Sequence, residues 1–129
     1  MLLITMLFSG LAAAIHVYIF VLESLCWERP ATRKAFGIQT DAEAIATKPM
    51  AFNQGFYNLF LALITVAGLA FTLASSTTVG ATLIFAGAGS MVAAGLVLLL
   101  SSPKLARAAM FQLTAPALAI LFGLYAFTH

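Results

Sequence analysis

Charge is what this sequence has least of. Its 129 residues include four acidic and six basic side chains, or 8% charged residues, whereas a typical soluble domain has about 25%. Hydrophobic residues make up 63% of the chain. So few charges cannot form the polar surface of a globule this size, which argues against a soluble domain, a disordered chain and a nucleic-acid-binding protein. The single cysteine excludes an intrachain disulfide and a cysteine-based zinc cluster.

The charged residues are confined to two segments of the chain. All ten lie within residues 23–48 and 104–107. A membrane-spanning helix needs about 20 mostly apolar residues, so each uncharged terminal stretch provides one span, and the 55 residues of 49–103 provide two, separated by the polar run at 75–78. The sequence therefore predicts an all-α, polytopic membrane domain over 1–129, a bundle of four transmembrane helices near 2–26, 50–74, 79–101 and 106–127.

The basic residues also predict how the chain is oriented. All six lie in the first and third loops: Arg29, Arg33, Lys34, Lys48, Lys104 and Arg107. Because loops rich in Lys and Arg stay in the cytoplasm, we expect both loops there and both termini outside. A dual-topology protein, the alternative, would have near-equal numbers of basic residues on the two sides. We expect the first helix to be retained rather than cleaved as a signal peptide, since no Lys or Arg precedes its long apolar run.

A capping motif lies in the first loop. Thr40 followed by Glu43 is typical of a capping box, which predicts a short helix over 41–47 at the cytoplasmic surface. Lys48-Pro49 is expected to end this helix, and Pro49 to begin the second span. The alternative is a disordered loop, because short helices are weak on their own.

Three of the predicted spans carry polar side chains at helical spacing, and polar groups inside a membrane are candidates for function. In the first span, Ser9, His16 and Glu23 recur every seven residues, which places them on one face. A heptad spacing in the second span relates Gln54, Asn58, Leu61, Thr65, Gly68 and Thr72, and Asn53 and Tyr57 flank these positions. In the last span, Pro116 lacks an N–H and so frees the carbonyl group of Gln112.

The depths of these groups predict a polar pocket. Counted at about 1.5 Å per residue, Glu23 and Gln54 lie roughly 6 Å from the cytoplasmic ends of their helices, and Gln112, Asn58 and His16 roughly 9, 12 and 16 Å. We therefore expect a pocket between the first, second and fourth spans that opens toward the cytoplasm. The predicted ligand-binding residues are His16, Glu23, Asn53, Gln54, Tyr57, Asn58 and Gln112. The outer half, with few polar groups, is expected to be closed.

The two ionisable candidates also have structural interpretations. Glu23 could be an interfacial carboxylate paired with Lys48 or Arg29, and His16 could make a purely structural hydrogen bond. His16 and Glu23 lie two helical turns apart, too far to be adjacent metal ligands on one helix. No metal site is therefore expected, and no cofactor, because no cofactor-binding motif is present.

The amide side chains have structural interpretations as well. Asn58 and Gln112 could form hydrogen bonds that tie the helices together, and Asn53 and Gln54 could cap the start of the second span. Trp27 is expected in the aromatic belt at the membrane surface.

One set of residues follows a recognisable pattern: His16, Glu23, Trp27, Phe36-Gly37, Asn53-Gln54-Gly55-Phe56-Tyr57-Asn58, Leu61-Ala62, Gln112 and Pro116. The pattern resembles a family of small bacterial and fungal membrane proteins, catalogued as domain of unknown function 1304, over the whole chain. The resemblance implies four spans and makes the polar residues a family signature, but it implies no activity. Together with the loop charges it predicts a multi-pass protein of the bacterial inner (plasma) membrane.

Three functions compete on this evidence. The favoured one is binding or transport of a small amphiphilic or cationic molecule, in which Glu23 alternates between a proton and a cation, similar to small multidrug exporters. The first alternative is a membrane-embedded enzyme with Glu23 and His16 as general acid and base and with Asn58 and Gln112 orienting the substrate. The second alternative is a structural or accessory subunit. A homodimer or homotrimer is expected in the lipid bilayer, because a bundle of 129 residues buries little on its own.

Overall fold

Four long helices form the molecule. The computed structural model describes residues 1–129 and has no strand. Its elements are α1 (Leu2–Phe20) continued by a π-helical turn (Val21–Leu25), α2 (Pro30–Phe36), α3 (Asp41–Leu73), α4 (Thr77–Ser101), a 3₁₀ turn (Pro103–Leu105) and α5 (Ala106–Thr128). Four of these segments are long and apolar enough to cross a membrane: Leu2–Leu25, Asp41–Leu73, Thr77–Ser101 and Pro103–Thr128. The predicted all-α fold with four membrane-spanning helices is confirmed.

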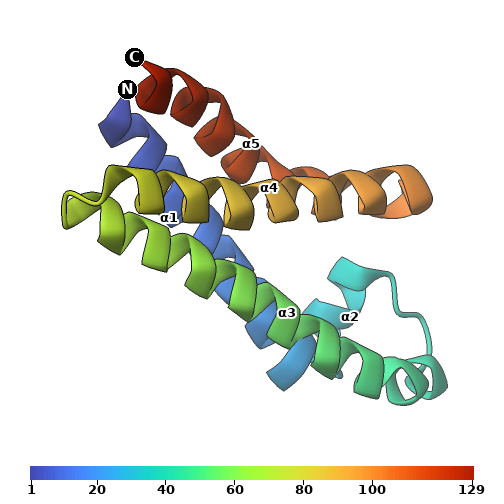
Figure 1. Cartoon of the computed structure of the whole chain (residues 1–129). Helices are drawn as coiled ribbons and strands as arrows, with labels where there is room; N and C mark the ends of the chain where they lie inside the picture. Colours follow the sequence, from blue (N-terminus) through green and yellow to red (C-terminus); the bar gives the residue numbers. More distant parts are fainter.

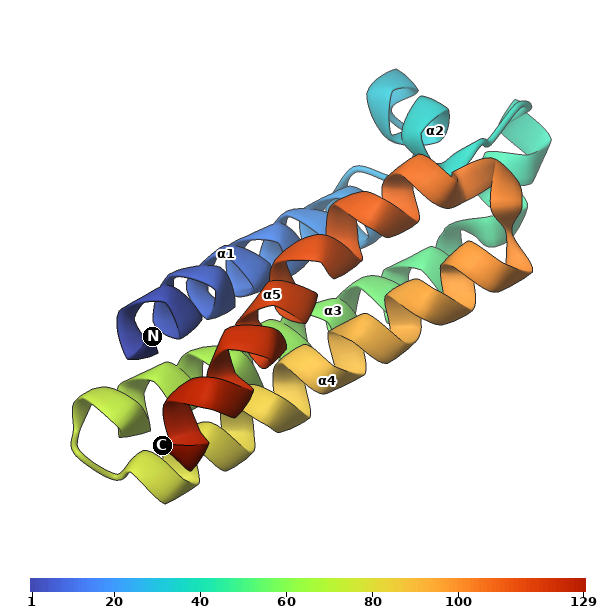
Figure 2. The ribbon, with the colours of Figure 1, turned by 90° about the horizontal axis from the view of Figure 1, so that it is seen from above.

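The long helices run alternately up and down and form a closed ring of contacts. α1 packs against α3 and α5, and α4 packs against the same two helices from the other side. Both termini lie at one end of the bundle, together with the turn between α3 and α4 (Figure 1). We call this the terminal end. α2 lies at the opposite end (Figure 2), which we call the charged end because residues 23–48 and 104–107 carry all ten charges there.

The terminal half of the α3–α4 contact is built from glycine and threonine. A Cβ atom added to Gly80 would lie 2.1 Å from Thr72 Oγ1, and one added to Gly87 would lie 2.2 Å from Thr65 Oγ1. The two threonine hydroxyls donate back to their own helix, to the carbonyl oxygens of Leu61 and Gly68, each at 2.9 Å. Absence of side-chain volume thus lets the two backbones approach closely, as is common for helices packed in membranes.

The second span begins earlier than the sequence predicts. α3 is one continuous helix of 33 residues, Asp41–Leu73, so the predicted separate helix over 41–47 and its termination at Lys48-Pro49 are wrong. Pro49 removes one helical N–H and leaves the carbonyl group of Ile45 without its usual partner. Both residues are exposed at the charged end, where water can solvate that carbonyl group, so the helix continues through the proline.

The predicted cap of this helix is present. The backbone N–H of Glu43 donates to Thr40 Oγ1 at 3.1 Å, and the Glu43 carboxylate accepts from the backbone N–H of Gln39 at 3.0 Å. Two amides at the helix start are satisfied in this way.

The first loop contains a second helix that the sequence analysis did not predict. α2 begins at Pro30, in the position that proline favours in helices, and ends at Gly37 with φ +71°. The N–H of Ile38 bonds to the carbonyl oxygen of Arg33 at 2.9 Å across this glycine, which is the closing bond of a Schellman motif. Pro30 and Gly37 are therefore the start and stop signals of a helix.

Trp27 anchors α2 against the first turns of α3. The indole ring is 8% exposed, lies 5.1 Å from the Phe36 ring, and donates from Nε1 to Thr47 Oγ1 at 3.0 Å. Arg33 adds an ion pair with Asp41 at 2.6 Å. The ring of Trp27 thus packs between α2 and α3, while its place in an aromatic belt at the membrane surface stays a prediction.

Candidate binding groove at the charged end

The π-helical turn at the end of α1 presents Glu23 to α3. Such a turn holds one more residue than an α-helical turn, and it often marks a functional site. Asn58 Nδ2 donates to Glu23 Oε1 at 2.8 Å, and the carboxylate residue is 6% exposed. Ser24, the next residue, donates from its hydroxyl to the carbonyl oxygen of Phe52 at 2.8 Å. Two neighbouring side chains of the π-turn, Glu23 and Ser24, thus form hydrogen bonds with α3.

Gly55 makes this contact geometrically feasible. A Cβ atom at this position would lie 2.0 Å from Ser24 Oγ and 3.0 Å from its backbone nitrogen, so no other residue type fits without displacing the π-turn. Within the run over residues 53–58, Gly55 and Asn58 therefore meet the π-turn, and the Phe56 ring lies 5.1 Å from the Phe20 ring of α1.

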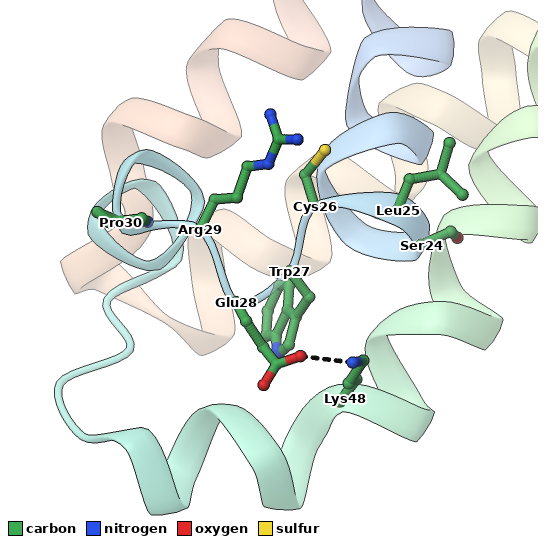
Figure 3. A pocket seen from close by; sticks show the side chains of 8 residues that line it. All are labelled: Ser24, Leu25, Cys26, Trp27, Glu28, Arg29, Pro30 and Lys48. Carbon is green, nitrogen blue, oxygen red and sulfur yellow. Dashed lines mark hydrogen bonds and ion pairs between the residues drawn. The ribbon is translucent and has the colours of Figure 1, made fainter.

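Glu23 forms no ion pair. The ion pairs of the chain are Arg33 with Asp41 and Lys48 with Glu28. Figure 3 shows Lys48 and Glu28 pointing toward one another beside Trp27. Lys48, one of the two cations considered as a partner of Glu23, therefore neutralises a different carboxylate.

His16 lies deeper in the bundle and bonds within its own helix. Its side chain is 1% exposed, and Nδ1 lies 2.9 Å from the carbonyl oxygen of Ala12. No hydrogen bond joins His16 to Glu23, Asn58 or Gln112. The acid and base of the enzyme hypothesis are thus engaged with different partners.

The other candidates on α3 point away from Glu23. Asn53, Gln54 and Tyr57 are exposed, Tyr57 to 61%. The buried positions of this region are Ala51, Gly55, Asn58 and Ala62, at alternating spacings of four and three residues. Gln54 is four residues before Asn58, and at about 100° per residue it falls on the edge of that face. The structure therefore brings together Glu23 and Asn58 but not Asn53, Gln54 or Tyr57.

Gln112 lines a large groove on another side of α1. The groove has a volume of about 1140 Å³ and is lined by 19 residues, 10 of them hydrophobic. It runs between the end of α1, α2 with the chain that follows it, the end of α4 and the start of α5. Gln112 is the one predicted ligand-binding residue that it contains, so the predicted polar set is divided between two places.

The groove wall contains both apolar and polar side chains. The apolar part includes Ile19, Leu22, Phe36, Leu98, Leu105 and Phe111. The polar part consists of Lys34, Gln39, Ser101, Ser102, Lys104, Arg107 and Gln112, with the hydroxyl of Tyr18 nearby in the wall. No acidic residue lines it. Lys34, Lys104 and Arg107 were the signal for this site in the sequence. From the sequence alone, these basic residues predicted only the orientation of the chain.

A second, smaller hollow of about 320 Å³ lies beside the π-turn. Its lining includes Cys26, Trp27 and Arg29, and the Glu28–Lys48 ion pair bridges its rim (Figure 3). Cys26 is half-buried and unpaired there. The hollow has about a quarter of the volume of the groove.

A comparison with protein families places the chain. Residues 10–124 match the family described as protein of unknown function DUF1304. The chain belongs to this family. The residues that match DUF1304 run from Gly10 in α1 to Leu124 in α5. They include both the Glu23–Asn58 contact and the residues that line the groove. No curated protein and no solved structure matches the chain. The resemblance predicted from the polar pattern is thus confirmed.

Proposed function

We propose that this DUF1304 protein binds a small amphiphilic molecule in the groove at its charged end. The observation that supports this function is the groove of about 1140 Å³, which is larger than most sites for small ligands. Its wall combines apolar with polar side chains, and α1, α4 and α5, which contribute to this wall, belong to segments long enough to cross a membrane. An amphiphile matches both parts of such a wall.

The charges of the loops support a cytoplasmic position for the groove. All six basic residues lie at the charged end and none at the terminal end, so the positive-inside rule puts the charged end in the cytoplasm and both termini outside. The ligand then enters from the cytoplasmic side of an inner membrane. Close packing of α3 on α4 at the terminal half is consistent with a site that is reached from one side.

A bulky residue placed in the groove tests this function. Ala35 is exposed on α2 and lines the groove, and Ala46 is exposed on α3 outside it. We expect Ala35→Trp to reduce the number of phospholipids that the purified protein retains from phosphatidylcholine–phosphatidylglycerol vesicles, counted by native mass spectrometry. Ala46→Trp adds the same side chain and should retain lipid as the unmodified protein does. Equal retention by all three proteins would overturn the proposal.

Proton-coupled export of a cationic molecule is the second candidate. Glu23 supports it, because this carboxylate lies in a membrane-spanning segment, is 6% exposed and has no cationic partner. Proton-driven transport of ethidium into vesicles should be lost in Glu23→Gln and kept in Glu28→Gln. Transport that persists unchanged in Glu23→Gln would exclude this mechanism.

A further inference from the structure

None of the four acidic residues of the chain lines the groove. Asp41 pairs with Arg33, Glu28 pairs with Lys48, and the Glu43 carboxylate accepts the N–H of Gln39 at the start of α3. The fourth, Glu23, accepts from Asn58 on the α3 side of α1. No acidic side chain therefore forms an ion pair with the cations of the groove.

Three basic residues of the groove have no ion-pair partner. Lys34, Lys104 and Arg107 line it, are exposed, and take part in neither ion pair of the chain. They come from α2, the 3₁₀ turn and the first turn of α5. The start of α5 adds a partial positive charge, since the N–H groups at a helix start carry the positive end of its dipole. Two separate segments of the chain thus contribute charge of one sign to one place.

We infer that the amphiphile is an anionic lipid whose headgroup is bound by Lys34, Lys104 and Arg107. This inference rests on the proposed function and names the chemical class of its ligand. Charge complementarity selects an anion, because a cationic molecule would be repelled by three unpaired cations with no carboxylate beside them. The groove therefore serves a different ligand class from the one that Glu23 would serve.

The depth of the lining selects a lipid over a soluble anion. Ile19 and Leu22 belong to the last turns of the α1 span, and Phe111 to the second turn of α5. These apolar side chains lie further inside their membrane-spanning segments than Lys104, which is the second residue of the Pro103–Thr128 segment, and Lys34 lies outside all four segments, on α2. The chain of a lipid would contact the apolar part while its headgroup stays at the level of the cations.

The face of α2 that lines the groove is suited to this arrangement. Ala31, Lys34 and Ala35 are related by three and four residues and all line the groove, so one face of α2 turns toward it. Two small side chains leave space beside the Lys34 chain. α2 itself is held in place by the Phe36–Trp27 contact and the Arg33–Asp41 pair, which fix the position of that lysine.

The headgroup preference of the retained lipid tests the inference. The purified full chain is exchanged into vesicles of phosphatidylcholine and phosphatidylglycerol in equal amounts, and the retained lipids are counted by native mass spectrometry. We expect phosphatidylglycerol to be enriched, and the enrichment to fall roughly fivefold for each of Lys34→Gln, Lys104→Gln and Arg107→Gln. Lys34→Arg should keep it.

A matched control separates the groove from general charge. Arg29 is exposed, unpaired and at the same end, but it lies outside the groove, so Arg29→Gln should leave the enrichment unchanged. A preference lost equally in Arg29→Gln would overturn the inference and assign the effect to the overall charge of that surface. Addition of inorganic phosphate supplies the other arm: if phosphate displaces the lipid at millimolar concentration, the site binds soluble anions and the lipid assignment is wrong.

The two proposals fail in distinguishable ways. If phosphatidylcholine and phosphatidylglycerol are retained equally and Ala35→Trp removes both, the groove binds amphiphiles without recognising their charge, and only the inference is wrong. If no lipid is retained at all, the proposed function is wrong. Circular dichroism and thermal unfolding of each variant show whether the fold is kept, which is expected because the substituted cations are exposed.

Discussion

The two ends of this bundle are built from different kinds of residue. At the terminal end, α3 and α4 approach through glycines whose missing side chains are replaced by threonine hydroxyls of the neighbouring helix. At the charged end the same two helices have diverged (Figure 1), and α2 and the groove occupy the side of α1 and α5 there. The comparison shows how a small bundle can hold two helices, α3 and α4, in close contact in one half and keep a hollow beside other helices in the other half.

The largest expected effect comes from adding volume to the closely packed end. Gly87→Leu places atoms where Thr65 and the Leu61 carbonyl oxygen already lie, and we expect a loss of about 3 kcal/mol in the free energy of unfolding. Thermal unfolding in a mild detergent measures it. Gly89 lies on the same helix with nothing within 4 Å of an added Cβ, so Gly89→Leu is the control. Similar melting temperatures for the two variants would show that α3 and α4 are not close-packed.

A smaller effect is expected at the hydrogen bond between Glu23 and Asn58 of α3. Asn58→Leu removes the donor of the buried Glu23 carboxylate, and the unfolding free energy should fall by about 2 kcal/mol because a buried acceptor is left unsatisfied. Glu23→Leu combined with Asn58→Leu should cost less than the two single changes added together. Strict additivity in this double-mutant cycle would mean that the two side chains do not interact.

The smallest effect is expected at a single hydroxyl group. Ser9 is fully buried, and its Oγ has no hydrogen-bond partner. Ser9→Ala removes an unsatisfied polar atom, so it should leave stability unchanged or raise it by up to about 1 kcal/mol. Thermal unfolding again supplies the measurement, and a marked loss of stability would show that this hydroxyl group has a partner.

The sequence was sufficient to count the spans, because its uncharged stretches are long enough to cross a membrane once or twice each. It also located the Thr40 cap, because capping depends on a few local residues. It did not locate the π-turn, since five residues of the same apolar helix (Val21–Leu25) carry no distinct pattern. Glu23 is nevertheless buried like Ser9 and His16, as their spacing of seven residues indicated.

The groove was not predictable from polar periodicity for a different reason. Its cations lie in two loops that are far apart in sequence, and Gln112 joins them only through the packing of α5 beside α1. Depth along the helices placed Glu23 and Asn58 in the same predicted pocket, and the structure joins them by a hydrogen bond. Asn53, Gln54 and Tyr57 have similar depth, but they face outward, because depth does not specify the direction of a side chain around a helix.

The uninterrupted α3 has a mechanical consequence. Its 33 residues extend roughly 50 Å, so the helix is longer than a hydrocarbon layer of about 30 Å and its first turns project beyond that layer. Thr47 and Asp41 in these turns bind Trp27 and Arg33, and through them they hold α2. The part of the groove wall that α2 forms is therefore attached to the projecting turns of α3. Bending is cheapest at Pro49, where a helical hydrogen bond is missing, so this proline is the natural pivot for widening the groove.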